Sequence, residues 1–152
     1  MFLAPGSRLD HRCSKALRQG WVYTGDAGYF GSSGHLYIVD RVKDMVITGG
    51  ENVFTTEVEN AVMTHPAVQD VAVIGIPSEQ WGEAVHAIVI LKPQKEASAE
   101  EIIAHCRARI AGYKLPKSLT FRTEPLPLSG AGKVLKTELR KPFWDGRERQ
   151  VN

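Results

Sequence analysis

The sequence predicts an α+β fold, in which a compact small domain with a central mixed β-sheet flanked by helices follows a β-hairpin. Residues 71–76 and 85–91 are uninterrupted apolar runs rich in β-branched side chains, which is typical of central strands covered by helices. Apolar residues recur at helical spacing before and after these runs. Nearer the N-terminus, residues 21–30 and 35–39 are strand-like and are separated by Gly-Ser-Ser-Gly, which indicates a hairpin.

Composition excludes several classes of protein. A chain of 152 residues suffices for one domain with its own core, and 19 basic and 17 acidic residues give a formal charge of +2 without a basic block. Nucleic acid is therefore not predicted as a partner. No apolar run reaches the roughly 20 residues of a transmembrane segment, so we expect a cytoplasmic location. Cys13 and Cys106 lack metal-ligand spacing, so two free thiols and no metal site are expected.

The first half of the small domain begins after the hairpin. Residues 45–48 are apolar and β-prone, and Gly49-Gly50 forces a turn. Helical spacing then begins at Thr56, where Thr55 or Thr56 can cap the helix, and Pro66 ends it.

The second half contains the two apolar strands and two further helices. Trp81 lies in the segment between the strands and is expected on a connecting loop. Ser98 and Glu101 form a capping box that opens a helix with a buried stripe up to Ile110. The remaining expected elements are a strand over 118–122, a loop over 125–132 and a terminal helix over 134–140.

Four features could carry chemistry. Asp26 in Thr-Gly-Asp offers a carboxylate that can accept hydrogen bonds from two vicinal hydroxyls. Arg41 offers planar donors that keep their charge. Gly49-Gly50 leaves backbone uncovered, so a thin extended group could lie against it. Lys133 follows the flexible run Ser-Gly-Ala-Gly, which could deliver its ammonium to an anion.

These motifs together resemble the C-terminal portion of the acyl-CoA synthetase branch of the adenylate-forming enzymes. The resemblance covers residues 20–140 and rests on GWVYTGD, on DRVKDMVITGGENV and on PLPLSGAGK. It implies that residues 1–40 are the end of a large N-terminal AMP-binding domain, including the hairpin, and that residues 41–152 are a mobile C-terminal domain. The phosphate-binding loop, the acyl pocket and most Mg²⁺ ligands would then lie outside this chain. Residues 1–19 fit the resemblance only loosely.

The resemblance also implies roles for single residues. Asp26 and Arg41 would bind the ribose of ATP, and Lys43 would be the hinge about which the small domain rotates. Lys133 would stabilise the carboxylate and the α-phosphate during adenylation, although Ala131 replaces a Ser or Thr that is usual in the family. Another departure is Thr55, where relatives often have a proline that opens the helix. The predicted CoA-binding residues are two glycines, two aromatic residues and two lysines: Gly49, Gly50, Trp81, Tyr113, Lys114 and Lys117.

Each candidate also has a plainer interpretation. Asp26 could be only a turn residue, and Arg41 could form a surface ion pair with Asp40 or Asp44, which contributes little. Lys43 and Lys133 could be solvated lysines, and the aromatic and basic patch could be an interior tryptophan beside a solvated loop.

The predicted function is that of the C-terminal part of an ATP-dependent acyl-CoA synthetase, an acid-thiol ligase that uses a carboxylate, ATP, CoA and Mg²⁺. Without the N-terminal domain, we expect the chain alone not to be catalytically competent. One alternative is the corresponding part of an adenylation domain that loads a carrier protein. A second alternative, of a different class, is a free-standing domain without catalysis that binds CoA or docks on a separate large domain.

Overall fold

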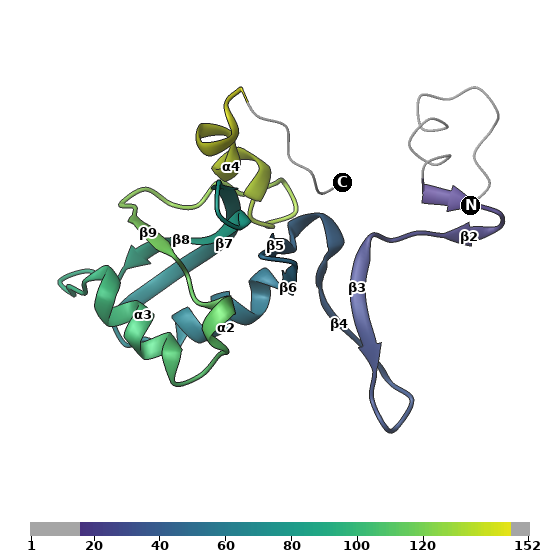
Figure 1. The fold of residues 1–152 in the computed structure, drawn as a ribbon, viewed down its shortest axis with the longest axis horizontal. Helices are drawn as coiled ribbons and strands as arrows, with labels where there is room; N and C mark the ends of the chain where they lie inside the picture. Colours follow the sequence, from purple (N-terminus) through teal and green to yellow (C-terminus); the bar gives the residue numbers. More distant parts are fainter. Residues whose placement is uncertain (1–15, 147–152) are drawn as a thin grey trace.

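The structure is a computed structural model that describes residues 16–146, so Cys13 and most of the loosely matching segment 1–19 lie outside the described residues (Figure 1). A hairpin extends from a domain in which helices cover both faces of a sheet. The elements are β1 (Leu17–Arg18), β2 (Trp21–Val22), β3 (Asp26–Phe30), β4 (Leu36–Arg41), η1 (Val42–Asp44), β5 (Val46–Thr48), β6 (Glu51–Val53), α2 (Thr55–Met63), β7 (Val68–Ser78), β8 (Gly82–Leu91), α3 (Ala99–Arg107), η2 (Gly112–Lys114), β9 (Ser118–Phe121) and α4 (Lys136–Trp144).

The sheet is built on the antiparallel pair β7 and β8, whose register runs from Val68 opposite Leu91 to Ser78 opposite Gly82. On the other side of β8, β9 adds a parallel partner, and the β5–β6 hairpin joins near Gly82. Parallel and antiparallel pairs therefore occur in one sheet, and the predicted α+β domain with a mixed sheet is confirmed.

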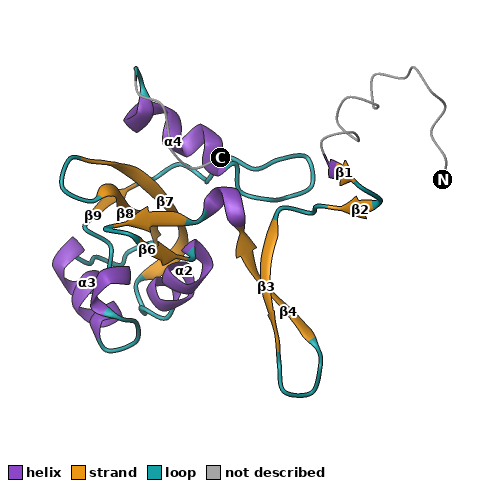
Figure 2. Ribbon diagram, turned by 45° about the vertical axis from the view of Figure 1, so that its right-hand side comes forward, coloured by secondary structure: helices purple, strands orange, loops and turns teal. Residues whose placement is uncertain are grey.

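Both faces of this sheet are buried, which explains the uninterrupted apolar runs. Along β7, Val71 and Val73 face a core shared with α2 and α3, whereas Ala72 and Ile74 face a second core beneath α4. Figures 1 and 2 show α2 and α3 on one side of the sheet and α4 on the other. Each fully buried valine or isoleucine contributes roughly 1.5–3 kcal/mol, so this pair of strands supplies much of the domain's stability.

The outer edge of β7 is covered by side chains. The Val73 N–H donates to Glu59 Oε1 of α2 at 2.8 Å, and the Gly75 carbonyl accepts from Trp144 Nε1 of α4 at 2.9 Å. An edge strand with unpaired backbone groups invites pairing with other chains. Both helices therefore protect this edge as well as the core.

The N-terminal hairpin differs from its prediction. A single strand over 21–30 was expected, but the chain leaves the extended form after Val22 and β3 begins only at Asp26. Gly25 has a φ of +74°, which breaks a continuous strand. Thr-Gly-Asp therefore lies at the start of β3 and not within a longer strand. Strands β3 and β4 pair antiparallel with a bulge between Ala27 and Gly28.

The glycine turn lies between two strands, of which the sequence indicated only the first. Thr48 pairs with Glu51, and Gly49 and Gly50 have φ values of +58° and +85°. Positive φ at both central residues is the requirement of a two-residue type I′ hairpin. Strand β6 was missed because Glu51 and Asn52 are exposed and carry no apolar pattern.

The cap residues predicted for α3 and for α2 have different outcomes. The Ser98–Glu101 capping box of α3 is confirmed, with both reciprocal hydrogen bonds present. In contrast, neither Thr55 nor Thr56 caps α2, because Phe54 occupies the cap position and makes no side-chain bond. The carboxylate that takes this role comes from Asp40 in β4, a tertiary contact. Helix α4 starts at Lys136, two residues later than expected. Within residues 16–146, no helix is long and apolar enough to cross a bilayer.

His86 is a buried polar residue in the centre of β8. One ring nitrogen lies 2.7 Å from Ser118 Oγ and the other 3.1 Å from Thr120 Oγ1, and its ring packs against Phe143 of α4. Burial lowers the pKa of His86 below its ordinary value of 6.5. The folded chain therefore favours the neutral imidazole.

We predict that acid destabilises the domain partly through His86. Above about pH 6.5, the ordinary pKa of an unfolded histidine, the ring is neutral in both states and does not change the free energy of unfolding. Below that pH the unfolded chain takes up a proton that the folded chain resists. The free energy of unfolding should fall as pH drops from 6.5 towards the lowered folded pKa. Urea unfolding of wild type and His86→Gln at pH 8 and pH 5.5 tests this. His35→Gln, at an exposed site of the hairpin, is the control, and an equal pH dependence in wild type and His86→Gln would contradict the prediction.

Candidate functional site

Asp26 and Arg41 lie side by side at the base of the hairpin. They are opposite each other in the β3–β4 register, and Arg41 Nε lies 3.4 Å from Asp26 Oδ1. Both side chains are partly exposed, so this ion pair adds little stability and remains accessible. An open cleft of about 750 Å³ is lined by residues 22–26 and 41–43, which include both partners and Lys43. The expected alternative partners of the Arg41 side chain have other partners: Asp44 pairs with Arg140, and Asp40 accepts bonds from the Arg41 backbone N–H and from Thr55 and Thr56.

Trp81 packs against the glycine turn. The Gly49 N–H donates to the Trp81 carbonyl at 2.9 Å, and a Cβ added at Gly49 would lie 2.8 Å from Trp81 Cε3. A Cβ at Gly50 would meet no atom within 4 Å. The indole therefore covers Gly49 while Gly50 remains open, and Trp81 lies on the β7–β8 turn as predicted.

The other predicted CoA-binding residues form a separate group around η2. Lys114 Nζ lies 5.5 Å from the centre of the Tyr113 ring and contacts both Glu57 carboxylate oxygens at 2.7 Å. This hydrogen-bonded carboxylate raises the pKa of Lys114, so the ammonium stays charged but is already paired. Lys117 is exposed, and its backbone N–H donates to Val85. A phosphate would thus meet Lys117 directly and would compete with Glu57 for Lys114.

Lys133 lies in an exposed loop with a fixed base. Leu128 and Val134 form an antiparallel bridge, and the Ser129 N–H donates to the Lys133 carbonyl at 2.8 Å. Gly132 has a φ of +73°, and its N–H donates to the Ser129 carbonyl. Within residues 16–146, no carboxylate forms an ion pair with the Lys133 ammonium.

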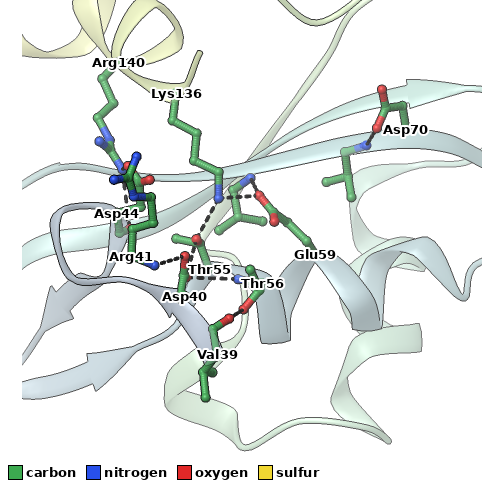
Figure 3. Close-up of polar contacts among 12 residues, drawn as sticks. Val39, Asp40, Arg41, Asp44, Thr55, Thr56, Glu59, Asp70, Lys136 and Arg140 are labelled. Carbon is green, nitrogen blue, oxygen red and sulfur yellow. Dashed lines mark hydrogen bonds and ion pairs between the residues drawn. The ribbon is translucent and has the colours of Figure 1, made fainter. Parts of the chain in front are cut away.

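Sequence reasoning missed a buried polar network between β4, α2 and α4 (Figure 3). Lys136 Nζ contacts Thr55 Oγ1 at 2.6 Å and Glu59 Oε1 at 2.7 Å, and Thr55 in turn donates to Asp40 Oδ2 at 2.7 Å. Burial raises the pKa of Glu59, although Lys136 opposes this. A second pair, Arg140 with Asp44, lies close by at 3.0 Å. The only sequence signal was the spacing of Lys136 and Arg140, four residues apart on one helix, which does not identify their partners.

The candidate residues described above can therefore present positive charge and open backbone to an anionic ligand. Within the described part of the chain, no three His, Cys, Asp or Glu side chains gather into a group that could hold a metal ion. Electrostatic stabilisation by positioned groups is the chemistry that these residues offer.

The chain forms a small mixed-sheet domain with an attached hairpin, a glycine turn and an exposed loop lysine. These features define a class of protein domain, and comparison with known proteins identifies that class. The model of the AMP-binding enzyme C-terminal domain matches residues 57–133. This chain belongs to that family, and the resemblance to adenylate-forming enzymes is confirmed.

The relatives are much longer proteins. "Long-chain-fatty-acid--CoA ligase FadD13" of Mycobacterium tuberculosis is 48% identical over 84% of this chain and 25% of its own length. "Fatty acid--[acyl-carrier-protein] ligase ScoC" of Streptomyces coeruleorubidus is 39% identical over 95% of this chain and 28% of its own length. The crystal structure of ATP-bound MatB from Rhodopseudomonas palustris matches with a TM-score of 0.81 at 32% identity, over 93% of this chain and 28% of that one. The chain thus spans about a quarter of the length of such relatives.

We predict that the two glycines of the turn differ in their tolerance of a side chain. Gly49→Ala should lower the free energy of unfolding by about 1–3 kcal/mol more than Gly50→Ala, because only the Cβ at position 49 meets the Trp81 ring. Urea denaturation of both variants measures the difference. In a Trp81→Ala background the difference should disappear, and equal losses in the wild-type background would contradict the prediction.

Proposed function

We propose that this chain is the C-terminal domain of an ATP-dependent acyl-CoA synthetase and contributes the adenylation lysine and the CoA-binding face. In the first half-reaction a carboxylate oxygen attacks the α-phosphorus of ATP, and pyrophosphate leaves. In the second, the CoA thiol attacks the acyl carbon, and AMP leaves. The enzyme would act in the cytoplasm, and the Mg²⁺ that balances the triphosphate would be bound outside this chain.

The position of Lys133 carries this proposal. Its ammonium is exposed at a loop whose base is held by the Leu128–Val134 bridge, so it can reach a ligand without breaking an internal ion pair. There it would stabilise negative charge on the carboxylate and the α-phosphate. Asp26 and Arg41 would hold the ribose by exchanging their mutual contact for hydroxyl groups of the ligand.

The hairpin supports the proposal that an N-terminal AMP-binding domain ends near residue 40. Its apolar side chains are exposed, and Phe30 and Ile38 reach 75% and 61% of full exposure. A two-stranded hairpin is marginally stable by itself in water. We infer that residues 1–40 complete a larger domain that covers these side chains, and that residues 41–152 form the mobile domain with Lys43 as its hinge.

The acceptor of the acyl group is proposed to be CoA. The open backbone at Gly50 would accommodate the pantetheine arm, Trp81 or Tyr113 could stack on adenine, and Lys117 could meet a phosphate. Since one relative is named as an acyl-carrier-protein ligase, a carrier protein is the second candidate. Release of a preformed acyl-adenylate by CoA, compared with release by a carrier-protein thiol, distinguishes the two acceptors.

We predict that Lys133→Ala in the full-length enzyme slows acyl-adenylate formation by roughly 10²-fold or more, the scale of losing one positioned charge-stabilising donor. Thioester formation from supplied acyl-adenylate should change little, because rotation about Lys43 would carry the loop away. Single-turnover measurement of each half-reaction is the test. Lys136→Ala is not a suitable control, because its ammonium is internally bonded, whereas the exposed Lys95→Ala should affect neither step. Comparable slowing of both steps, or none of the first, would contradict the assigned role.

We also predict that the 152-residue chain alone folds but does not catalyse ATP–pyrophosphate exchange, because the phosphate and acyl sites would lie in the N-terminal domain. Circular dichroism checks the fold, and an exchange assay with carboxylate mixtures checks activity. Exchange above background by the pure chain would disprove its dependence on that domain. Absence of any effect of the chain on a truncated enzyme that lacks this region would favour the non-catalytic alternative.

A further inference from the structure

Helix α2 is capped from the opposite side of the expected hinge. Phe54 precedes the helix in an extended conformation and makes no side-chain bond to it. The Thr56 N–H instead donates to Asp40 Oδ2 at 3.2 Å, and Asp40 belongs to β4. A carboxylate at a helix N-terminus satisfies an otherwise unpaired N–H and interacts favourably with the helix dipole. The start of α2 therefore depends on a residue of the hairpin.

The Thr55 hydroxyl connects this cap to α4. It donates to Asp40 Oδ2 at 2.7 Å and accepts from Lys136 Nζ at 2.6 Å, a combination that one hydroxyl can satisfy (Figure 3). Thr55 is fully buried, and Asp40 is 7% exposed. Lys136 is held in place by Glu59 Oε1 at 2.7 Å. A buried chain of charge and hydroxyl thus runs from the hairpin through α2 to α4.

The contacts on each side of Lys43 locate a pivot independently of the family resemblance. Arg41 pairs with Asp26, so it moves with the hairpin. Asp44 pairs with Arg140 of α4 in a buried contact of 3.0 Å, so it moves with the small domain. The 3₁₀ turn Val42–Asp44 joins the two, and its few residues can absorb a change of backbone angles.

Three hydrogen bonds between β4 and α2 cross this pivot and must break when it rotates. Two are the bonds of Asp40 Oδ2 to Thr55 and Thr56, and the third is from Thr56 Oγ1 to the Val39 carbonyl at 2.7 Å. Rotation would leave a buried carboxylate and a helix N-terminus without their partners, which is costly. The arrangement therefore favours one orientation.

We propose that Asp40, Thr55 and Lys136 form a latch that holds the small domain in one of its two orientations, and that the Thr55 hydroxyl sets the strength of the latch. The inference deepens the proposed function, because an enzyme with two half-reactions requires both orientations. Weakening the latch would shift the population towards the other orientation and leave the folded core intact.

Removing the Thr55 hydroxyl tests the latch in the 152-residue chain. Spin labels at Ser32→Cys in the hairpin turn and Glu100→Cys on α3 report the orientation by pulsed dipolar spectroscopy, and both positions are exposed. Cys13→Ser removes one native thiol. Cys106 can remain, because it is fully buried and burial raises the pKa of its thiol.

In wild type we expect one predominant label–label distance. Thr55→Val keeps the side-chain shape but removes the hydroxyl, and it should increase the population of a second distance about tenfold, the effect of losing a buried hydrogen bond. Thr55→Ser keeps the hydroxyl and should behave as wild type. Thr64→Val is the matched control, because the Thr64 hydroxyl lies at the opposite end of α2, where it donates to the Ala61 carbonyl and lies 2.8 Å from His105 Nε2.

Thr55→Pro provides a second variant should valine disturb the helix start. Proline is favoured at the first helical position, and Phe54 already has the extended conformation that precedes proline. Both variants should show the second distance while amide exchange in β8 stays slow. The same distance distribution in wild type, Thr55→Val and Thr55→Pro, or an equal change in Thr64→Val, would overturn the latch. The measurement needs no catalysis, so its result is independent of the test of Lys133.

Discussion

Strands β7 and β8 stay together because apolar side chains cover both faces of the sheet that they form. Val73 and Val89 face α2 and α3, and Ile74 and Ile88 face α4. This two-sided burial fixes the register, since a shift by one residue would exchange the two faces. The candidate residues from Gly49 onward take their positions from this pair, either on the turn that joins the strands or on segments packed against them.

Gly49, Gly50, Trp81 and Lys133 lie on turns and loops, whereas Asp26 and Arg41 lie opposite each other at the ends of β3 and β4. Trp81 is on the β7–β8 turn and covers Gly49 of the neighbouring β5–β6 turn. Lys133 is held only at the base of its loop, so its ammonium can move. A stable sheet with adaptable edges would suit the proposed role, in which the domain presents different groups to one ligand in succession.

Polar groups, rather than apolar packing, join the hairpin to the domain. Asp40 and Thr55 are buried, Lys136 and Glu59 are half-buried, and all four have their hydrogen bonds made, so each would be costly if left alone. Apolar packing tolerates small shifts, but hydrogen bonds of this kind hold only in one geometry. Such a junction can therefore have two discrete states instead of a continuous range.

The sequence by itself determined the elements whose signal is local. The apolar runs of β7 and β8, the Ser98–Glu101 capping box and the Gly49-Gly50 turn depend on neighbouring residues, and all were predictable. The motifs also indicated the family, which the match to residues 57–133 confirms. The roles of Asp26, Arg41 and Lys133 stay predictions, since they concern ligands and not the fold.

Only the tertiary structure decided how distant segments meet. The cap of α2 comes from Asp40, and Lys136 reaches Thr55 across 81 residues of sequence. No local pattern identifies such partners, because in the sequence an Asp or Lys that will be paired in the interior cannot be told from one that will be exposed. Their pairing follows from the two-sided core, which brings β4, α2 and α4 together. Charges that are removed from water where these elements meet must be paired.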